Sequence, residues 1–154
     1  MELYLVRHAD SHPPDVNPDP PISGKGIHDT KMIAKFLKHS VIIIDEIWVS
    51  VKKRAQETAG IIAGVASPRT VPLQKEGLKP TDNPGPIFEE IQNYKGNLMI
   101  VSHLPFLEKL LSLILLQNED QSLVNFQGSS VLCLKKENGL WKISWMLTPD
   151  LFNK

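Results

Sequence analysis

Short apolar runs alternate along the chain with longer segments in which apolar residues recur at helical spacing. Runs of roughly four to eight residues, rich in β-branched side chains, are typical of buried strands. The predicted strands are Glu2 to Val6, Val41 to Val49, Val71 to Leu73, Asn97 to Val101, Ser130 to Leu134 and Trp141 to Leu147. The predicted helices run from an N-cap at Ser23 to near Ser40, from Lys52 to Val65, from Pro86 to Tyr94 and from Leu104 to Leu116.

Further detail of the pattern constrains how these elements pack and connect. The run Val41 to Val49 is apolar enough for a strand covered on both faces. Five prolines between Pro13 and Pro21 exclude regular structure and predict a loop. Glu137-Asn138-Gly139 predicts a tight turn between the last two strands. The first helix is expected to bury one apolar stripe, formed by Ile27, Met32, Ile33, Phe36 and Leu37.

Alternation of strands with helices indicates the fold class. It favours βαβ units, and therefore a mostly parallel central sheet with helices on both faces. We expect an α/β fold built as a three-layer α/β/α sandwich, with the last two strands forming an antiparallel hairpin at one edge. A chain of 154 residues has the length of one compact domain, so residues 1–154 are expected to form a single domain.

Polar side chains follow three of the predicted strands directly. These polar groups are Arg7-His8, Ser50 through Arg54, and Ser102-His103. Ligands of open α/β sheets bind outside the carboxyl ends of the strands. We therefore expect two arginines and two histidines to converge at one edge of the sheet.

Two arginines and two histidines in one site suit phosphoryl transfer. A guanidinium stays charged and offers a planar fork of donors that matches phosphate oxygens. A neutral imidazole is a nucleophile near pH 7, and the phosphoramidate that it forms can be hydrolysed in a second step. Cationic donors around the transferring group supply most of the catalysis, so this chemistry requires neither a metal nor a cofactor.

Composition narrows the classes of partner and location. Seventeen basic side chains balance seventeen acidic ones, so no net field recruits nucleic acid or an anionic membrane. No apolar run approaches the roughly 20 residues of a membrane span, and we expect no secretory leader. Cys133 is the single cysteine, which favours a cytoplasmic location and a buried structural role. His8 and His12 have the spacing of helical metal ligands, but Pro13-Pro14 exclude a helix there, so we expect no zinc site.

Four segments, in matching order, resemble motifs of the histidine phosphatase superfamily, whose members have the phosphoglycerate mutase-like fold. Leu5 to Asp10 resembles the Arg-His signature, and Ile22 to Gly26 resembles the Leu-Thr-x-x-Gly helix start. Val49 to Ala59 resembles Ser-Pro-x-x-Arg-Ala-x-Gln-Thr-Ala, and Val101 to Pro105 resembles Gly-His-x-Pro. The short length and two further segments resemble the SixA-type phosphohistidine phosphatases in particular: Leu78 to Asp82 and Leu147 to Leu151.

The resemblance, which covers nearly the whole chain, implies roles for the matched side chains. His8 is the expected nucleophile, and Arg7 and Arg54 are the expected phosphate clamp. His103 is expected to bind the phosphoryl oxygens, as a cation in the loaded state. Ser50, at the start of the third motif, is expected to join Arg7, Arg54 and His103 among the substrate-binding residues.

Four positions depart from the family pattern. Ala9 and Ser102 replace glycines, Val51 replaces a proline and Glu57 replaces a glutamine. Side chains at Ala9 and Ser102 add bulk where backbone passes close to ligand in the family, which would narrow the site or lower activity.

Larger relatives use an acidic residue to protonate the leaving group, and that residue has no clear counterpart in this sequence. Asp82 is the candidate acid, and Glu76 is a weaker one. A P–N bond to imidazole needs less help from an acid than an alkoxide does, because imidazole leaves readily. The pattern therefore favours phosphohistidine over sugar phosphates.

The leading hypothesis is a phosphatase that removes phosphoryl groups from phosphohistidine on a protein, by a ping-pong mechanism through phospho-His8. The alternative enzyme is a small-molecule phosphomonoesterase; a shallow open site would favour the former and a deep enclosed pocket the latter. An alternative from another class is a catalytically weak phosphate-binding module, motivated by Ala9, Val51 and Ser102. The proline-rich loop 13–21 follows His8 directly and is a candidate lid.

Overall fold

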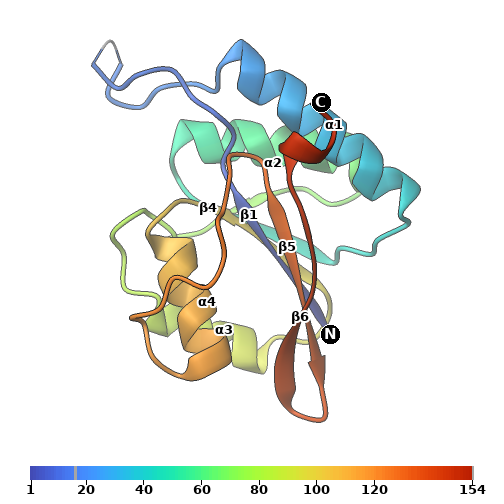
Figure 1. Ribbon diagram of the computed structural model, residues 1–154, viewed down its shortest axis with the longest axis vertical. Helices are drawn as coiled ribbons and strands as arrows, with labels where there is room; N and C mark the ends of the chain where they lie inside the picture. Colours follow the sequence, from blue (N-terminus) through green and yellow to red (C-terminus); the bar gives the residue numbers. More distant parts are fainter. Residues whose placement is uncertain (16, 154) are drawn as a thin grey trace.

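The computed structural model describes residues 1–15 and 17–153, arranged around one six-stranded sheet (Figure 1). The strands are β1 (Glu2–Arg7), β2 (Glu46–Val49), β3 (Leu73–Gln74), β4 (Leu98–Ser102), β5 (Val131–Glu137) and β6 (Leu140–Leu147). The helices are α1 (Gly24–His39), α2 (Lys53–Ala66), α3 (Gly85–Asn93), α4 (Phe106–Leu116) and a short 3₁₀ helix, η1 (Pro149–Leu151). The strand order is β3-β2-β4-β1-β5-β6, parallel from β3 to β1 and antiparallel in β5 and β6. This arrangement confirms the predicted α/β class and the edge hairpin.

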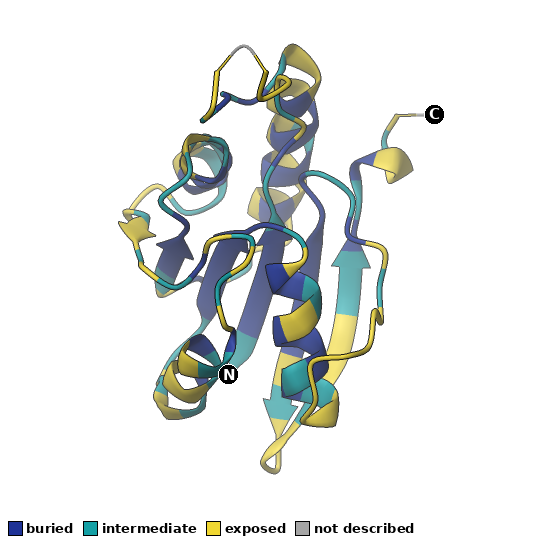
Figure 2. Cartoon of the chain, turned by 90° about the vertical axis from the view of Figure 1, so that its left-hand side faces the viewer, coloured by how far each residue is buried: buried dark blue, intermediate teal, exposed yellow. Residues whose placement is uncertain are grey.

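Helices cover both faces of the sheet, so its central strands are buried (Figure 2). Tyr4 and Val6 of β1 face the layer formed by α1 and α2. Leu3 and Leu5 face the layer formed by α3 and α4. All four side chains are fully buried. Strands buried on both faces are apolar at successive positions, which explains the continuous run in the sequence.

Helix α1 begins as predicted and buries Ile33 and Leu37 of the predicted stripe, but not all of that stripe. Ser23 is the N-cap, and its Oγ accepts a hydrogen bond from Gly26 N at 3.0 Å. Ile27 and Phe36 of the predicted stripe are 38% and 44% exposed, so this part of the prediction is wrong. Gly26 faces inward instead, and a Cβ built there would lie 2.2 Å from the backbone oxygen of Asp10. Close approach of the chain after β1 therefore requires a glycine at this point of α1.

The first half of the run Val41 to Val49 is not a strand, contrary to the prediction. Strand β2 begins at Glu46, which pairs with Leu98, the first residue of β4. Residues 41–44 therefore lie beyond the end of the strand that would be their neighbour. Val41 has a φ of 52° directly after α1 and is 82% exposed.

Remaining boundaries agree more closely with the sequence pattern. The strand predicted at Val71 to Leu73 is found two residues later, as the exposed pair that forms β3. Asn138 and Gly139 have φ of 51° and 77°, as the tight turn between β5 and β6 requires. Cys133 is buried on β5, as predicted. No helix in the described residues is long and apolar enough to cross a membrane.

Candidate active site

Strands β1 and β4 bring the two histidines together at the carboxyl edge of the sheet. Arg7 is paired with Ser102 in the parallel ladder, and His8 N donates to Ser102 O at 2.9 Å. The residues that follow, His8 and His103, have ring centroids 5.0 Å apart. Arg54 joins them from the first turn of α2, which follows β2. The structure therefore places all four predicted residues in one region.

Hydrogen bonding orients the imidazole of His8. Its Nδ1 lies 2.7 Å from the backbone oxygen of Ala9, which can only accept, so Nδ1 carries the proton. Nε2 is then the unprotonated nitrogen, and Arg54 Nε donates to it at 3.4 Å. Burial is the main cause that lowers the pKa of His8 to about 4; the hydrogen bond to the Ala9 carbonyl opposes this change, and the charges of Arg54 and Arg7 add to it. His8 is therefore a neutral imidazole at physiological pH, and the lone pair of its unprotonated Nε2 faces the Arg54 guanidinium.

Two buried donors beside this imidazole are unsatisfied. Arg7 Nη1 donates to Phe126 O at 2.7 Å, but its Nε has no hydrogen-bond partner within residues 1–15 and 17–153. His103 Nε2 lies 2.8 Å from Ser50 Oγ, whereas Nδ1 has no partner in the described part of the chain. Buried polar groups are normally paired, so such atoms are candidates for ligand contacts.

Burial also controls the charge of the second histidine. It lowers the pKa of His103 to about 3, with further contributions from His8, Arg54 and Lys52. His103 is 1% exposed and is therefore neutral in the free protein. Ser50 is fully buried next to it, which places the Ser50 hydroxyl in contact with His103.

Thr58 supports the site, although the sequence analysis did not single it out. Its Oγ1 accepts a hydrogen bond from Ala9 N at 2.9 Å and donates to Arg54 O at 2.7 Å. One hydroxyl thus links the loop that carries His8 to the helical turn that carries Arg54. Thr58 lies four residues after Arg54, and this helical spacing within the third motif is the only signal that could have identified it.

Three of the four family departures have a clear structural setting. A Cβ built on Gly26 would lie 3.1 Å from Ala9 Cβ, so the Ala9 methyl group packs against α1. The buried hydroxyl of Ser102 donates to Leu78 O at 2.6 Å. Glu57 accepts a hydrogen bond from Ile22 N at 3.2 Å. These side chains hold surrounding loops in place, and none of them contacts the His8 imidazole.

Two open depressions flank the histidines and meet at Ser11. The first, which we call the basic cleft, has a volume of about 550 Å³. Its lining residues are Ser11, Pro14, Pro18, Pro20, Lys52, Arg54, Lys79, Pro80, Thr81 and Asp82. The second, which we call the acidic pocket, has a volume of about 460 Å³. Its lining residues are Arg7, His8, Ala9, Asp10, Ser11, Lys25, Asp29, Gln127, Gly128, Pro149 and Asp150.

The proline-rich loop forms one wall of the basic cleft. Asp19 anchors it, since the carboxylate oxygens of Asp19 accept from Lys53 N, at the start of α2, at 3.1 and 3.3 Å. On the opposite wall, Asp82 Oδ2 accepts from Lys79 N at 2.9 Å. Asp82, the candidate acid, therefore shares this cleft with Arg54.

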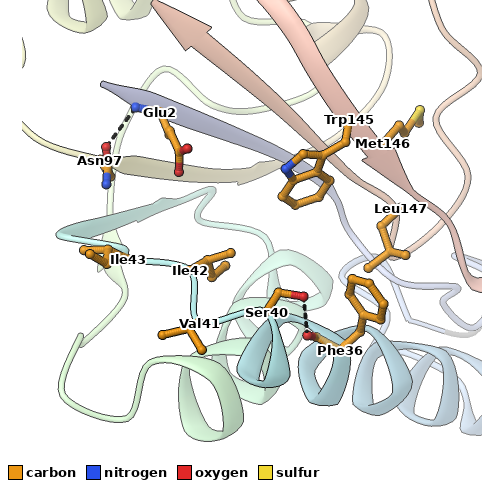
Figure 3. Close-up of a pocket in the computed structure, with 10 residues that line it drawn as sticks. All are labelled: Glu2, Phe36, Ser40, Val41, Ile42, Ile43, Asn97, Trp145, Met146 and Leu147. Carbon is orange, nitrogen blue, oxygen red and sulfur yellow. Dashed lines mark hydrogen bonds between the residues drawn. The ribbon is translucent and has the colours of Figure 1, made fainter.

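A larger pocket lies at the other end of the sheet (Figure 3). It has a volume of about 770 Å³, is walled mainly by apolar side chains such as Phe36, Ile42 and Trp145, and lies beside Glu2 at the start of β1. None of the predicted site residues lines it. Within the described residues there is no group of three or more His, Cys, Asp or Glu side chains that could hold a metal ion.

Two histidines and two arginines thus meet at the carboxyl ends of the strands. Comparison with family models agrees with this site: the chain belongs to the histidine phosphatase superfamily. The model of branch 1 of that superfamily matches residues 3–79. No curated protein matches the chain. Membership of this superfamily supports a phosphatase activity.

Solved structures that resemble the chain include SixA-type phosphatases. The protein histidine phosphatase SixA complexed with tungstate is 18% identical, with a TM-score of 0.87 over 99% of both chains. The putative phosphohistidine phosphatase SixA from Agrobacterium tumefaciens is 18% identical, with a TM-score of 0.78 over 96% of this chain and 97% of that one. A phosphoserine phosphatase from Entamoeba histolytica, in complex with 3-phosphoglyceric acid, is 18% identical, with a TM-score of 0.71 over 96% of each chain. These likenesses establish the phosphoglycerate mutase-like fold.

Proposed function

We propose that this protein is a phosphohistidine phosphatase that forms a covalent phosphoryl intermediate on Nε2 of His8. The observation that carries the proposal is the orientation of the imidazole: Ala9 O fixes the proton on Nδ1, and Nε2 is left free beside Arg54. A neutral nitrogen with a free lone pair is what nucleophilic attack on phosphorus requires. Family membership, established on residues 3–79, supports the same reaction class.

The phosphoryl group binds between the cationic and unsatisfied donors. Arg7 Nε and His103 Nδ1, which have no partner in the described chain, donate to its oxygens together with the Arg54 guanidinium. Ser50 Oγ donates to His103 Nε2 when His103 is neutral, which places the ring proton on Nδ1. The bound dianion then favours the cationic form of His103.

Transfer proceeds in two displacements at phosphorus. The lone pair on His8 Nε2 forms a P–N bond while the bond from phosphorus to the leaving group breaks, and its electron pair departs with that group. Water then attacks phospho-His8, which releases inorganic phosphate and restores the neutral imidazole. Arg7 and Arg54 stabilise the negative charge that spreads over the equatorial oxygens in both steps.

Protein-bound phosphohistidine is the substrate that the site favours over small phosphomonoesters. The basic cleft and the acidic pocket are both open to solvent on one side, which suits an imidazole that protrudes from a protein surface. An imidazole also leaves without a strong acid. Asp82, the candidate acid, lines the basic cleft, so it serves only a leaving group that lies on that side of His8, such as the alkoxide of a phosphomonoester.

Rapid-quench labelling tests this mechanism. The protein is mixed with a phosphohistidine protein carrying labelled phosphoryl, and the trapped label is expected to be acid-labile and base-stable. His8→Ala should abolish the label and reduce turnover by about 10³-fold or more. His12→Ala, which removes an exposed imidazole from the following loop, is the matched control and should behave as the native protein does.

Two results would contradict the proposal. One is label on the His8→Ala variant equal to that on the native protein. The other is a native protein that turns over neither phosphohistidine nor any phosphomonoester, which would indicate a phosphate-binding module. Faster turnover of phosphoserine or p-nitrophenyl phosphate than of phosphohistidine would instead assign the small-molecule alternative.

A further inference from the structure

The two depressions beside His8 differ in charge. Lys52, Arg54 and Lys79 line the basic cleft, against the single carboxylate of Asp82. Apart from Arg7 and His8, the charged residues that line the acidic pocket are one lysine and three aspartates: Lys25, Asp10, Asp29 and Asp150. A substrate bound over His8 therefore has a positive environment on one side and a negative one on the other.

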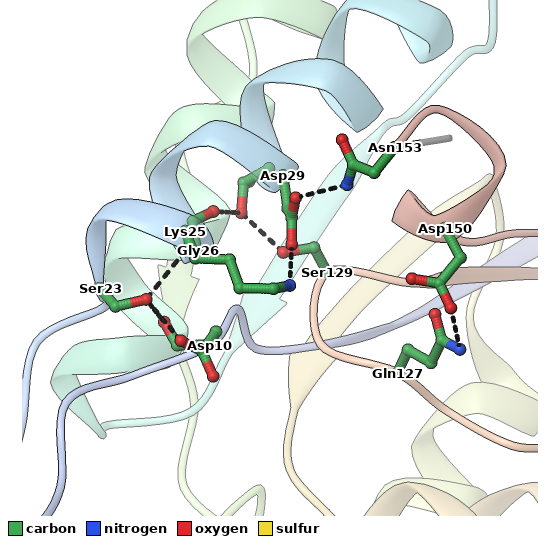
Figure 4. A network of polar contacts seen from close by, with 10 residues as sticks. Asp10, Ser23, Lys25, Gly26, Asp29, Gln127, Ser129, Asp150 and Asn153 are labelled. Carbon is green, nitrogen blue, oxygen red and sulfur yellow. Dashed lines mark hydrogen bonds and ion pairs between the residues drawn. The ribbon is translucent and has the colours of Figure 1, made fainter.

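One of these carboxylates is neutralised within the protein. The side chain of Asp29 is 4% exposed and accepts hydrogen bonds from Lys25 Nζ at 2.6 Å and Asn153 Nδ2 at 2.9 Å (Figure 4). The ammonium of Lys25 is therefore paired with Asp29, which raises the pKa of Lys25, with smaller contributions from Asp10 and Asp150.

Asp10 and Asp150 form no salt bridge within the described residues. Asp150 Oδ2 accepts a hydrogen bond from Gln127 Nε2 at 2.7 Å, and Asp10 Oδ2 accepts one from Ser23 Oγ at 2.5 Å (Figure 4). Both donors are neutral, so they orient the carboxylates without compensating them. Both aspartates are exposed and line the same pocket as His8.

We propose that the acidic pocket is the subsite for the leaving group, and that Asp10 and Asp150 select leaving groups with a positively charged nitrogen. The proposal rests on the proposed function, because it needs a phosphoryl group bound over His8. With the phosphoryl group held by Arg7 and Arg54, the rest of the substrate extends toward Asp10 and Asp150. A carboxylate-bearing substrate such as 3-phosphoglycerate is repelled there.

The same charge assists cleavage of a phosphoramidate. In protonated phosphohistidine the ring nitrogen remote from phosphorus carries an N–H, and a carboxylate accepts its hydrogen bond and stabilises the cation. When the P–N bond breaks, its electron pair stays on the ring and a neutral imidazole departs. No proton has to be delivered during this step, so the two aspartates act as positioning and selectivity residues.

Two substrates that carry the same phosphoryl group but leaving groups of opposite charge measure this selectivity. We compare kcat/KM for phosphoimidazole and for 3-phosphoglycerate in the native protein, in Asp10→Asn, in Asp150→Asn and in the double variant. One unit charge at roughly 6 Å, in a medium between protein surface and water, changes the ratio by about three- to ten-fold. Each single variant is expected to lower the preference for phosphoimidazole by that factor, and the double variant by more. Asp15→Asn, an exposed aspartate outside both sets of lining residues, should leave the ratio unchanged.

Binding provides a readout that does not depend on turnover. Protonated 1-methylimidazole, added to the native protein with inorganic phosphate, should shift the backbone amide resonances of Gln127 and Gly128. The shifts should disappear in the Asp10→Asn, Asp150→Asn double variant.

The outcomes separate the two proposals. An active enzyme whose substrate ratio and amide shifts are unaffected in the double variant overturns the subsite and leaves the proposed function intact. A native protein without phosphatase activity that still shows the aspartate-dependent amide shifts overturns the proposed function and keeps a cation-binding pocket. A native protein without those shifts and without any preference for phosphoimidazole also overturns the subsite.

Discussion

Thr58→Val removes one buried hydroxyl and retains nearly the same side-chain volume. The hydroxyl accepts from Ala9 N at 2.9 Å and donates to Arg54 O at 2.7 Å. Ala9 O in turn holds His8 Nδ1 at 2.7 Å. The substitution therefore tests whether a single hydroxyl keeps His8 and Arg54 in their relative positions.

The cost comes mainly from the N–H of Ala9. Thr58 and Ala9 are fully buried, so solvent does not replace the lost acceptor. An unsatisfied buried donor costs about 1–3 kcal/mol, and the methyl group of valine returns little of this. For a domain of this size 1 kcal/mol lowers Tm by roughly 2–4 °C, so we expect a decrease of about 2–12 °C. Displacement of the His8 loop by a fraction of an ångström should also lower kcat/KM by about 10- to 100-fold.

Thermal melting and steady-state kinetics on one substrate measure both effects. Thr58→Ser is the matched variant, because it keeps the hydroxyl and loses only a methyl group. It should recover most of the activity and cost about 1 kcal/mol in stability. The reasoning fails if Thr58→Val melts within 1 °C of the native protein and keeps its activity, or if the serine variant is as impaired as the valine variant.

Two further predictions concern stability. Because burial lowers the folded-state pKa of His8 to about 4 and of His103 to about 3, whereas unfolded histidine titrates near 6.5, the unfolded state takes up protons first. The free energy of unfolding should therefore be highest above pH 6.5 and fall as the pH is lowered towards 4, by on the order of 3 kcal/mol for His8 alone. Denaturant titrations at a series of pH values measure this change. A free energy of unfolding that does not vary with pH would contradict the prediction. Gly139→Ala should destabilise by about 1–2 kcal/mol, because φ is 77° although no atom obstructs a Cβ there. Gly64→Ala, within α2 and also unobstructed, should stabilise by about 0.5–1 kcal/mol, and equal changes in Tm for the two alanine variants would refute this backbone argument.

The sequence was sufficient to predict which strand ends meet. His8 and His103 each follow an apolar run, and parallel strands bring their carboxyl ends to one edge whatever their order in the sheet. Arg54 required more, because its position depends on the first turn of α2 after Ser50. Its place in the polar group Ser50 through Arg54 predicted the convergence, and the motif resemblance agreed with it.

The sequence pattern could not predict features that depend on how the strands pair and on which distant segments come into contact. The β-branched run at Val41 has strand propensity, but a strand also needs a neighbour, and β4 begins only at Leu98. The predicted buried face of α1 was wrong at Ile27 and Phe36 for a related reason. Its position is set by contact between Gly26 and the backbone of Asp10, and a glycine carries no apolar signal. Thr58, Asp10 and Asp150 likewise acquire their roles only through contacts between distant segments.

The arrangement of the site explains why it lies at the end of such a thoroughly buried sheet. Arg7 Nε and His103 Nδ1 have no hydrogen-bond partner among residues 1–15 and 17–153, and an unsatisfied buried donor costs about 1–3 kcal/mol. A mobile scaffold would relieve these costs by pairing the donors with backbone carbonyls. Here the parallel ladder continues to the last residue before the site, with His8 N bonded to Ser102 O and Ser50 N to Val101 O. Both faces of the sheet are packed, so the strand ends cannot rotate to satisfy the donors. The packed core thus keeps these nitrogens in place, where the proposed function assigns them to a bound phosphoryl group.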